Sequence, residues 1–546
     1  MPASVVSASQ PVLHQAPEHR RHQLVTLVAV LACVYFTALV YYAAVRPIDA
    51  DEGFYATAAR LVWEGKTPYR DFFYQQAPLL PYVYSWVWGM QPRSLLAMRS
   101  LSAIFGAAAV MLWGIWLVKA KPFSSKVALA TFLTILLNPY WISWNVAVKT
   151  YAFSNLLMTV ALIALCTGLK SARTRWFCAA GLALGLCASA RSFYGPLILV
   201  VLVWLLVRDG RSFQRYSRAG MFLAGALIGL LPIILSFARD PHAFLFNNVQ
   251  YHGMQAGYMP VGDQPVVGYQ SWEYALLGYL GFIFLVLLGL HFYFTTQLVV
   301  AGIGFASFAK VRKQDVSPYT LEHSRFLELT SLLFLAYTLV ALIPFFPYDQ
   351  YFTSPLVSFL VPFIAVGWST VFSYGRKWLI VLAVVAPLLV AQGIRRESWE
   401  YSRAPIWQIP EFRKVTSAIT TNSSPHDVVL SFWPGYVFES GREYLPGMED
   451  QFSYRIINLI NPEARARYRL ISAGQIIQTV SNRTPAVLVI ATMKSRLMTE
   501  LYANFSANEI TAFQTAVHDN YSLVTNVDDV EIYRRQEPEP KTSAVQ

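Results

Sequence analysis

Three acidic residues stand within four positions near the start of the chain, at Asp49, Asp51 and Glu52. Clustered carboxylates repel one another and lose hydration on burial, so their position directly after an apolar segment needs a cause. One cause is chemical, because a carboxylate can remove a proton from a hydroxyl group and a pair can hold a divalent cation. The other cause is structural, because Asp49 or Asp51 would cap a helix over Tyr55–Arg60.

The elements that must position this cluster are membrane helices. Hydrophobic residues make up 55% of the chain and charged residues 14%, and the mean hydropathy is +0.40. A soluble domain carries about a quarter of its residues as charged side chains, so this chain has too few to cover a water-exposed surface. A helix needs roughly 20 apolar residues to cross a bilayer. About eleven segments satisfy this condition, near residues 24–45, 97–118, 127–144, 150–169, 176–191, 195–207, 219–237, 275–309, 326–345, 355–372 and 378–394.

The charges between these segments predict their orientation. Lys and Arg gather in alternate connections, at residues 20–21, 119–126, 170–175, 208–218, 310–325 and 376–377. Basic residues are retained on the cytoplasmic side of the plasma membrane, which predicts a cytoplasmic N-terminus. The loops 46–96 and 238–274 and the C-terminal part are then extracytoplasmic. Because the net charge of +12 is divided among short connections, it does not indicate nucleic-acid binding.

The chain changes character after the last apolar segment. Residues 405–535 have ordinary polar content and predict a C-terminal α/β domain, after a membrane part at 19–404. Disorder is predicted for residues 1–18 and 536–546. The expected strands are Val428–Phe432, Ala486–Ala491, Ser522–Thr525 and Val530–Tyr533, and the expected helices are Pro462–Ser472 and Ala507–His518.

The first outer loop carries a set of motifs in a fixed order. Asp51-Glu52 is followed by Tyr55, then by Gly-x-x-Pro-Tyr ending at Tyr69, then by Pro-Leu-x-Pro-Tyr at 78–82. This set resembles the polytopic GT-C glycosyltransferases, among them the protein mannosyltransferase, aminoarabinose transferase and RgtA/B/C/D-like families. The resemblance covers the first loop well, the membrane part to about residue 394 loosely, and the C-terminal domain poorly. It implies an α-helical polytopic membrane protein that takes a sugar from a polyprenyl-phosphate carrier at the outer face.

The resemblance also implies roles for the acidic residues. Asp51 matches the catalytic carboxylate that serves as base, and Glu52 matches its neighbour, which orients the loop or the acceptor. Asp49, Tyr55 and Tyr69 would support the loop or the acceptor. Asp49 and Asp51 together are the candidate ligands for a divalent metal ion, on whose use the relatives differ.

One departure from the resemblance concerns the carrier phosphate. The aminoarabinose transferases carry a phosphate-contacting Lys where this chain has Gln75-Gln76-Ala77, and Gln76 donates hydrogen bonds without charge. The remaining cations on the outer side are Lys149 and Arg191. Their alternative roles are structural, since Lys149 would snorkel toward water and Arg191 would cap a helix C-terminus.

A late outer loop supplies two further candidates for the phosphate. The stretch 346–352 resembles the family's late loop in which a Tyr or Lys faces the carrier phosphate, and here it holds Tyr348 and Tyr351. The alternative for these tyrosines is an interfacial aromatic belt.

Taken together, the sequence predicts a membrane glycosyltransferase of the cell envelope. It would move one sugar from a polyprenyl-phosphate donor to an extracytoplasmic acceptor (a glycan, a lipid or a protein) by inverting displacement. The main alternative is a secondary transporter or lipid-sugar flippase, which about eleven spans would also fit. Against it, the acids gather at one surface and the sequence shows no internal repeat. A third possibility is an assembly scaffold, which rests on the C-terminal domain alone.

Overall fold

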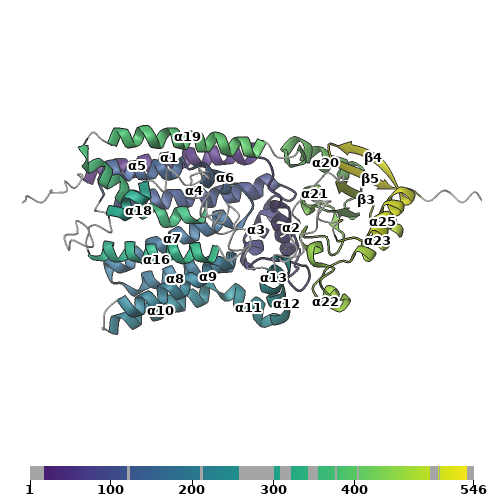
Figure 1. Ribbon diagram of the computed structural model, residues 1–546, viewed down its shortest axis with the longest axis horizontal. Helices are drawn as coiled ribbons and strands as arrows, with labels where there is room; N and C mark the ends of the chain where they lie inside the picture. The colour runs from purple at the N-terminus through teal and green to yellow at the C-terminus, as the bar shows by residue number, and fades with distance from the viewer. Residues whose placement is uncertain are drawn as a thin grey trace, which may run out of the picture.

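The computed structural model describes residues 18–119, 123–208, 213–256, 300–307, 321–341, 354–375, 378–401, 405–491, 502 and 504–537. A bundle of long helices occupies one end of the molecule and a smaller α/β domain the other (Figure 1). Two short helices of the first loop, α2 (Glu52–Trp63) and α3 (Leu79–Met90), lie between these parts. The acidic cluster is therefore positioned where the two parts of the chain meet.

Five helices within the described ranges are long and apolar enough to cross a membrane. They belong to α1 (Glu18–Val45), α4 (Leu95–Lys119), α7 (Thr150–Ser171), α16 (Leu321–Ala341) and α18 (Pro355–Ser373). Shorter apolar helices are α5 (Ser125–Leu136), α8 (Thr174–Ala190) and α9 (Gly195–Arg208), which continues the 3₁₀ turn η1 (Ser192–Tyr194). The chain is thus a multi-pass membrane protein.

Two predicted spans are interrupted. The segment 127–144 is wrong as a single helix, because α5 ends at Leu136 and Asn138 caps a new helix, α6 (Pro139–Trp144). The segment 219–237 divides into α10 (Phe213–Gly229) and α11 (Leu231–Arg239), which meet at 53° just before Pro232. Proline lacks the N–H of a continuing helix, which accounts for both breaks. Most of the segment 275–309 lies outside the described residues, so the count of about eleven stays a prediction.

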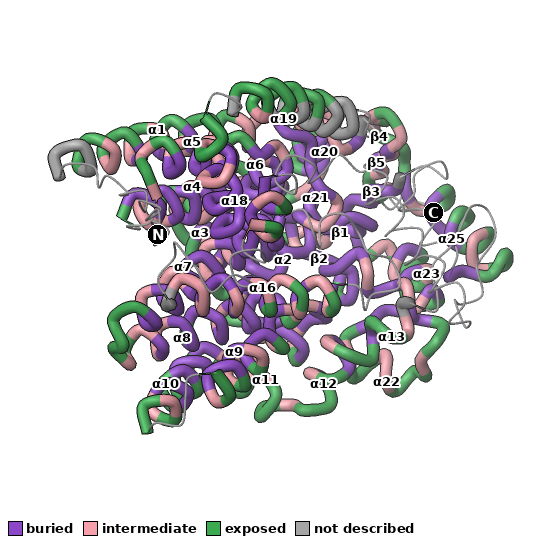
Figure 2. The backbone as a smooth tube through the Cα atoms, turned by 60° about the vertical axis from the view of Figure 1, so that its left-hand side comes forward, coloured by how far each residue is buried: buried purple, intermediate pink, exposed green. Residues whose placement is uncertain are grey.

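Burial separates the lipid-facing helices from the interior. Figure 2 shows buried residues where α2, α3, α4 and α18 meet, whereas the outer turns of α1 and α19 (Trp378–Tyr401) are exposed. The exposed side chains of these two helices include Val34 at 60% and Ile380 at 66%. Continuous apolar surface of this kind is covered by lipid in a membrane protein.

Helices α8 and α10 approach until their backbones touch. A Cβ atom on Gly181 would lie 2.0 Å from the carbonyl oxygen of Phe222, and one on Gly225 would lie 2.0 Å from that of Cys178. Small residues permit this close contact between membrane helices. The packing fixes the end of α8, where Arg191 lies, relative to the rest of the bundle.

The C-terminal domain is built on a five-stranded sheet of order β2-β1-β3-β5-β4. Strand β1 pairs in parallel with β2 and β3, whereas β5 pairs antiparallel with β3 and β4. The strands are β1 (Val428–Ser431), β2 (Glu443–Tyr444), β3 (Val487–Ala491), β4 (Tyr521–Val527) and β5 (Val530–Arg535). The four predicted strands correspond to β1, β3, β4 and β5, whereas β2 is too short to show a sequence pattern.

Helices accompany this sheet, and three of the described ones, α22 (Pro462–Arg467), α23 (Ala473–Ser481) and α25 (Ala507–Asn520), begin at a polar side-chain cap. The other described helices are η4 (Pro405–Trp407), α20 (Ile409–Thr421), α21 (Pro434–Ser440) and η5 (Ser453–Ile456). The predicted helix Ala507–His518 is confirmed as α25. The predicted helix Pro462–Ser472 is wrong, because α22 ends at Arg467 and Ser472 forms a capping box that starts α23.

Candidate active site

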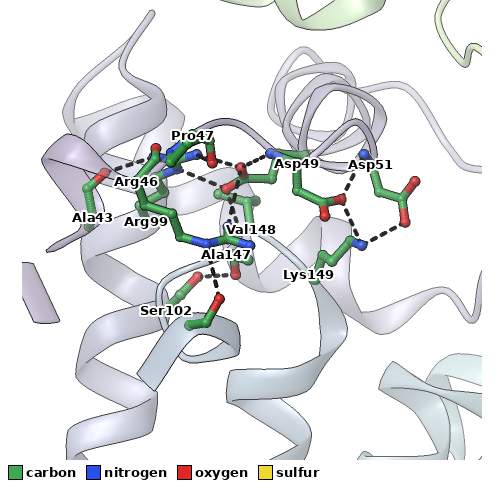
Figure 3. Close-up of polar contacts among 12 residues, drawn as sticks. Ala43, Arg46, Pro47, Asp49, Asp51, Arg99, Ser102, Ala147, Val148 and Lys149 are labelled. Atoms are coloured by element: carbon green, nitrogen blue, oxygen red, sulfur yellow. Dashed lines mark hydrogen bonds and ion pairs between the residues drawn. The ribbon is translucent and has the colours of Figure 1, made fainter. Parts of the chain in front are cut away.

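Glu52, the first residue of α2, is completely buried and saturated with hydrogen bonds. Its Oε1 accepts from Nε of Arg99 at 2.9 Å and from the Val148 amide at 2.9 Å. Its Oε2 accepts from Nη2 of Arg99 at 2.6 Å and from the Asp49 amide at 2.8 Å (Figure 3). Burial alone would raise the pKa of Glu52, but Arg99 outweighs it and the pKa is lowered. Four donors therefore surround the carboxylate of Glu52, which leaves its predicted catalytic role a prediction.

Arg99 is a functional residue that the sequence reasoning missed. Its Nη1 donates to the carbonyl oxygens of Ala43 and Arg46, both at 2.8 Å, and its Nη2 donates to that of Pro47 at 3.2 Å. The guanidinium therefore joins the end of α1 to Glu52 at the start of α2. A signal for it existed, because a lone arginine inside the apolar segment 97–118 has to be paired.

Asp49 and Asp51 converge on one ammonium group, that of Lys149. Nζ of Lys149 lies 2.7 Å from Oδ1 of Asp49 and 2.8 Å from Oδ2 of Asp51 (Figure 3). The side chain of Lys149 is 4% exposed and that of Asp51 is 27% exposed. Snorkelling is thus the wrong interpretation of Lys149, which is buried against carboxylates and against the ring of Trp144 at 5.0 Å.

The capping interpretation of the acidic cluster fails for Asp51 and holds in part for Asp49. Asp51 occupies the N-cap position of α2, yet its side chain makes no capping hydrogen bond and turns to Lys149. Oδ1 of Asp49 accepts from the Asp51 amide at 3.1 Å and supports the turn. The helix that follows is confirmed as α2.

The electrostatics of this triad favour a base at Asp51. Burial raises the pKa of Asp51, the charge of Lys149 opposes it and the charge of Asp49 adds to it, so the pKa ends above its ordinary value. Burial alone would lower the pKa of Lys149, but the two carboxylates more than offset it and raise the pKa. Lys149 therefore stays charged, while Asp51 is a stronger proton acceptor than a solvated aspartate.

The residues present do not fit a divalent metal ion at Asp49 and Asp51. The ammonium of Lys149 takes the position between the two carboxylates that such an ion would need. Across the described part of the chain, no group of three or more His, Cys, Asp or Glu side chains could hold a metal ion. Oxygen-rich ligand sets are what Mg²⁺ and Ca²⁺ require.

Arg191, at the end of α8, contacts Thr150 and Tyr151 at the start of α7, next to Lys149. Nη1 of Arg191 donates to Oγ1 of Thr150, the residue after Lys149, at 3.0 Å. The guanidinium also lies 4.7 Å from the ring centre of Tyr151. Arg191 occupies the C-cap position of α8, but its side chain extends across to α7. The structure thus brings together the two cations that the sequence assigned to the carrier phosphate.

Buried aromatic rings pack against one another within the first loop. Tyr55 and Tyr69 are buried, and their rings lie 6.4 Å and 6.3 Å from that of Tyr74. The Tyr69 hydroxyl donates to the carbonyl oxygen of Gln76 at 2.6 Å, and Tyr69 adopts a positive φ of 70°. A non-glycine residue at positive φ is held there by its surroundings. Tyr55 and Tyr69 therefore shape the loop, and the role of the Gln76 side chain toward phosphate stays a prediction.

Tyr348 and Tyr351 lie outside the described residues, so their predicted role toward phosphate is not addressed by the structure. The described part of the second outer loop includes α12 (Pro241–Leu245), the π-helical turn η2 (Phe246–Gln250) and α13 (Tyr251–Ala256). From α13, Nε2 of His252 lies 2.9 Å from the carbonyl oxygen of Gln75. The loops 46–96 and 238–274 are therefore in contact.

The C-terminal domain binds directly to the acidic loop. Nε1 of Trp433 and Nε2 of Gln451 both donate to the carbonyl oxygen of Ala50, at 2.7 Å and 2.9 Å. Farther along α2, Nη1 of Arg60 donates to the carbonyl oxygen of Arg442 at 2.6 Å. Ala50 lies between the two aspartates. These contacts from the C-terminal domain therefore help to fix the backbone position of Asp51.

Gly53 makes this docking possible and gives a first prediction. A Cβ atom there would lie 2.7 Å from Nε1 of Trp433 and 2.9 Å from the Gly435 amide. We expect Gly53→Ala to lower the free energy of unfolding by about 1–3 kcal/mol, as overpacking does, and to lower the thermal midpoint in detergent. The control is Gly195→Ala, since a Cβ there meets nothing within 4 Å. Equal midpoints for Gly53→Ala and the unmodified protein would contradict this view of the interface.

Comparison with known proteins gives one family match. The family model for dolichyl-phosphate-mannose-protein mannosyltransferase matches residues 75–237, a range that includes Lys149 and Arg191 and begins after Asp51. No curated protein matches the chain in sequence.

Solved structures match over nearly the whole chain. ArnT from Cupriavidus metallidurans bound to undecaprenyl phosphate is 13% identical with a TM-score of 0.62, and the match covers 93% of this chain and 97% of ArnT. ArnT in the apo state is 12% identical with a TM-score of 0.58, covering 94% of this chain and 98% of ArnT. The apo oligosaccharyltransferase of Archaeoglobus fulgidus is 11% identical with a TM-score of 0.50, covering 96% of this chain and 76% of that protein.

At these identities the likeness is one of fold, and it includes the C-terminal domain, which the sequence motifs covered poorly. The resemblance indicated by the first outer loop is confirmed, because each of these proteins is a GT-C glycosyltransferase. The chain has the GT-C glycosyltransferase fold.

Proposed function

We propose that this protein is a membrane glycosyltransferase that moves a sugar from a polyprenyl-phosphate donor to a hydroxyl group of an extracytoplasmic acceptor. The observation that carries the proposal is Asp51, a partly exposed carboxylate with a raised pKa, held against Lys149 at the end of the membrane helices. The fold adds support, since a similar one in ArnT was solved with undecaprenyl phosphate bound.

The proposed reaction is a direct displacement with inversion. Asp51 removes the proton of the acceptor hydroxyl, whose oxygen bonds to the anomeric carbon while the bond from that carbon to the phosphate oxygen breaks. The electron pair of the broken bond leaves with the phosphate, and nearby cations stabilise the charge that develops there. Lys149 and Arg191 supply these cations. When Asp51 takes up the proton it becomes neutral, so Lys149 keeps a single carboxylate partner and its charge acts more strongly on the phosphate.

A transfer assay tests this proposal against the transporter alternative. Purified protein receives undecaprenyl phosphate carrying a radiolabelled sugar, together with the envelope fraction of cells that lack the protein. We expect the label to become covalently bound to a component of that fraction, with release of undecaprenyl phosphate, and a series of labelled sugars identifies the donor. Movement of the label into proteoliposomes without covalent transfer would instead support a transporter or flippase.

A further inference from the structure

Asp450 is a buried carboxylic acid of the C-terminal domain with an unpaired oxygen. The residue is 2% exposed, and its Oδ1 accepts from the Phe452 amide at 2.8 Å. Among the described residues, Oδ2 of Asp450 has no hydrogen-bond partner, and neither has the Tyr74 hydroxyl or Oε1 of Gln451. Buried polar groups are nearly always paired, so three orphaned oxygens in neighbouring residues indicate a group that is paired in another state.

Three contacts hold this part of the chain against the acidic loop. Gln451, the next residue, donates to the carbonyl oxygen of Ala50, directly before Asp51. The ring of Phe452 lies 5.5 Å from that of Phe54 on α2, and the Phe452 carbonyl oxygen accepts from the Tyr251 hydroxyl at 3.0 Å. The two residues that follow Asp450 are therefore held against the loop, α2 and α13.

The charges around Asp450 decide its protonation. Burial raises the pKa of Asp450 to about 8, the Phe452 amide opposes this rise, and the charges of Asp51 and Glu449 add to it. Arg455, whose guanidinium lies 4.3 Å from the ring centre of Phe452, is the cation that lowers it. The uncharged phenol of Tyr74 faces the same group. Asp450 is therefore mostly protonated at neutral pH and can donate a hydrogen bond.

We propose that Asp450 is a substrate-binding residue of the active site, whose carboxyl group donates a hydrogen bond to a second hydroxyl of the acceptor while Asp51 holds the first. This inference rests on the proposed function. It makes the acceptor a glycan, free or lipid-linked, because a serine or threonine side chain offers a single hydroxyl. The rings of Tyr74 and Phe452 both pack against the ring of Phe54.

The position of Asp450 favours contact with the acceptor over contact with the donor. A prenyl chain lies in the membrane, so the phosphate of the donor stays near the ends of α7 and α8, where Lys149 and Arg191 lie. Asp450 belongs to the C-terminal domain, which lies at the other end of the molecule from the helical bundle (Figure 1), and the next residue, Gln451, donates to the carbonyl oxygen of Ala50.

Two substitutions at one position separate hydrogen bonding from packing. The transfer assay is run with the amount of the envelope fraction varied, so that the apparent KM for acceptor is measured. We expect Asp450→Ala to raise this KM by roughly 3- to 10-fold, the worth of one lost hydrogen bond, with unchanged binding of undecaprenyl phosphate. Asp450→Asn keeps a donor of the same shape, so its KM should stay close to that of the unmodified protein. Asp528→Asn, at an exposed turn of the same domain, is the matched control.

The pH profile gives a readout that a purely structural role would not change. In the unmodified protein the apparent KM for acceptor should rise as pH increases through about 8, since Asp450 then loses its proton and the donated bond. The amide of Asp450→Asn does not titrate, so this rise should disappear. An unchanged KM in Asp450→Ala, or a rise that persists in Asp450→Asn, overturns the inference. Absence of any transfer by the unmodified protein would instead refute the proposed function.

Discussion

Replacing Asp51 with asparagine should slow sugar transfer by about 10²- to 10⁴-fold, the usual contribution of a general base. The amide keeps the size of the carboxyl group but cannot take the acceptor proton. Its oxygen can still accept a hydrogen bond from Lys149, which lies 2.8 Å from Oδ2 in the native protein. We therefore expect kcat to fall while the unfolding midpoint and the affinity for undecaprenyl phosphate change little. The measurement is the initial rate of covalent transfer at saturating donor.

The control for this variant is Asp71→Asn in the same loop. Asp71 pairs with the exposed Arg70 at 2.8 Å and accepts from the Thr67 amide, so its loss affects only a local turn. Its transfer rate should stay within about twofold of the native rate, as for surface substitutions. A native rate in Asp51→Asn would remove Asp51 from the reaction.

Protonation of Asp51 should also determine how the transfer rate falls at low pH. Asp51 acts in its charged form, and burial raises its pKa, so the rate should fall as pH decreases already above the ordinary aspartate range. Asp51→Asn should lose this acid limb along with most of the rate.

The second large effect is on stability and concerns Glu52. Glu52→Gln should lower the free energy of unfolding by about 3–5 kcal/mol, the cost of removing one partner from a buried ion pair. Arg99, whose Nη2 lies 2.6 Å from Oε2, would remain buried at 1% exposure without its counter-charge. Thermal unfolding in detergent measures the change. Because the same carboxylate accepts from the Asp49 amide, the acidic loop should loosen and transfer should fall as well.

Glu64→Gln, at the other end of α2, is the matched control. Glu64 pairs with Arg60 at 2.6 Å, but its side chain is 30% exposed, and partly exposed pairs contribute about 0–1 kcal/mol. Equal losses in Glu52→Gln and Glu64→Gln would contradict the special role of the buried pair. The pKa of Glu52 is lowered in the folded protein, so its contribution is present above the ordinary glutamate pKa and is lost as pH falls through the folded value.

Part of the site could be predicted from the sequence because its residue types are unusual where they occur. The acidic cluster stands beside an apolar segment, and Lys149 and Arg191 are rare cations in loops otherwise poor in them. Their arrangement could not be predicted. Lys149 forms ion pairs with both Asp49 and Asp51, and Glu52 forms an ion pair with Arg99. Both arrangements depend on packing between helices that are distant in sequence.

The fold, like the site, could be predicted only in part from the sequence. Apolar length predicted the helices well, but it concealed the break at Asn138-Pro139, where a local polar cap prevails over an otherwise apolar segment. The contact of Asp450 and Gln451 with the acidic loop left no signal in the sequence. Asp450 and Gln451 lie in an irregular stretch without periodicity or motif, and their relation to Ala50 arises from tertiary contact alone.

The two hydrogen bonds on the Ala50 carbonyl oxygen have a consequence for biosynthesis. Trp433 follows Ala50 by 383 positions, so the ribosome makes the acidic loop long before it makes the residue that holds this loop in place. Under the proposed function, we expect a chain that ends before Trp433 to lack transfer activity, because the Ala50 carbonyl oxygen then has neither of these two hydrogen bonds.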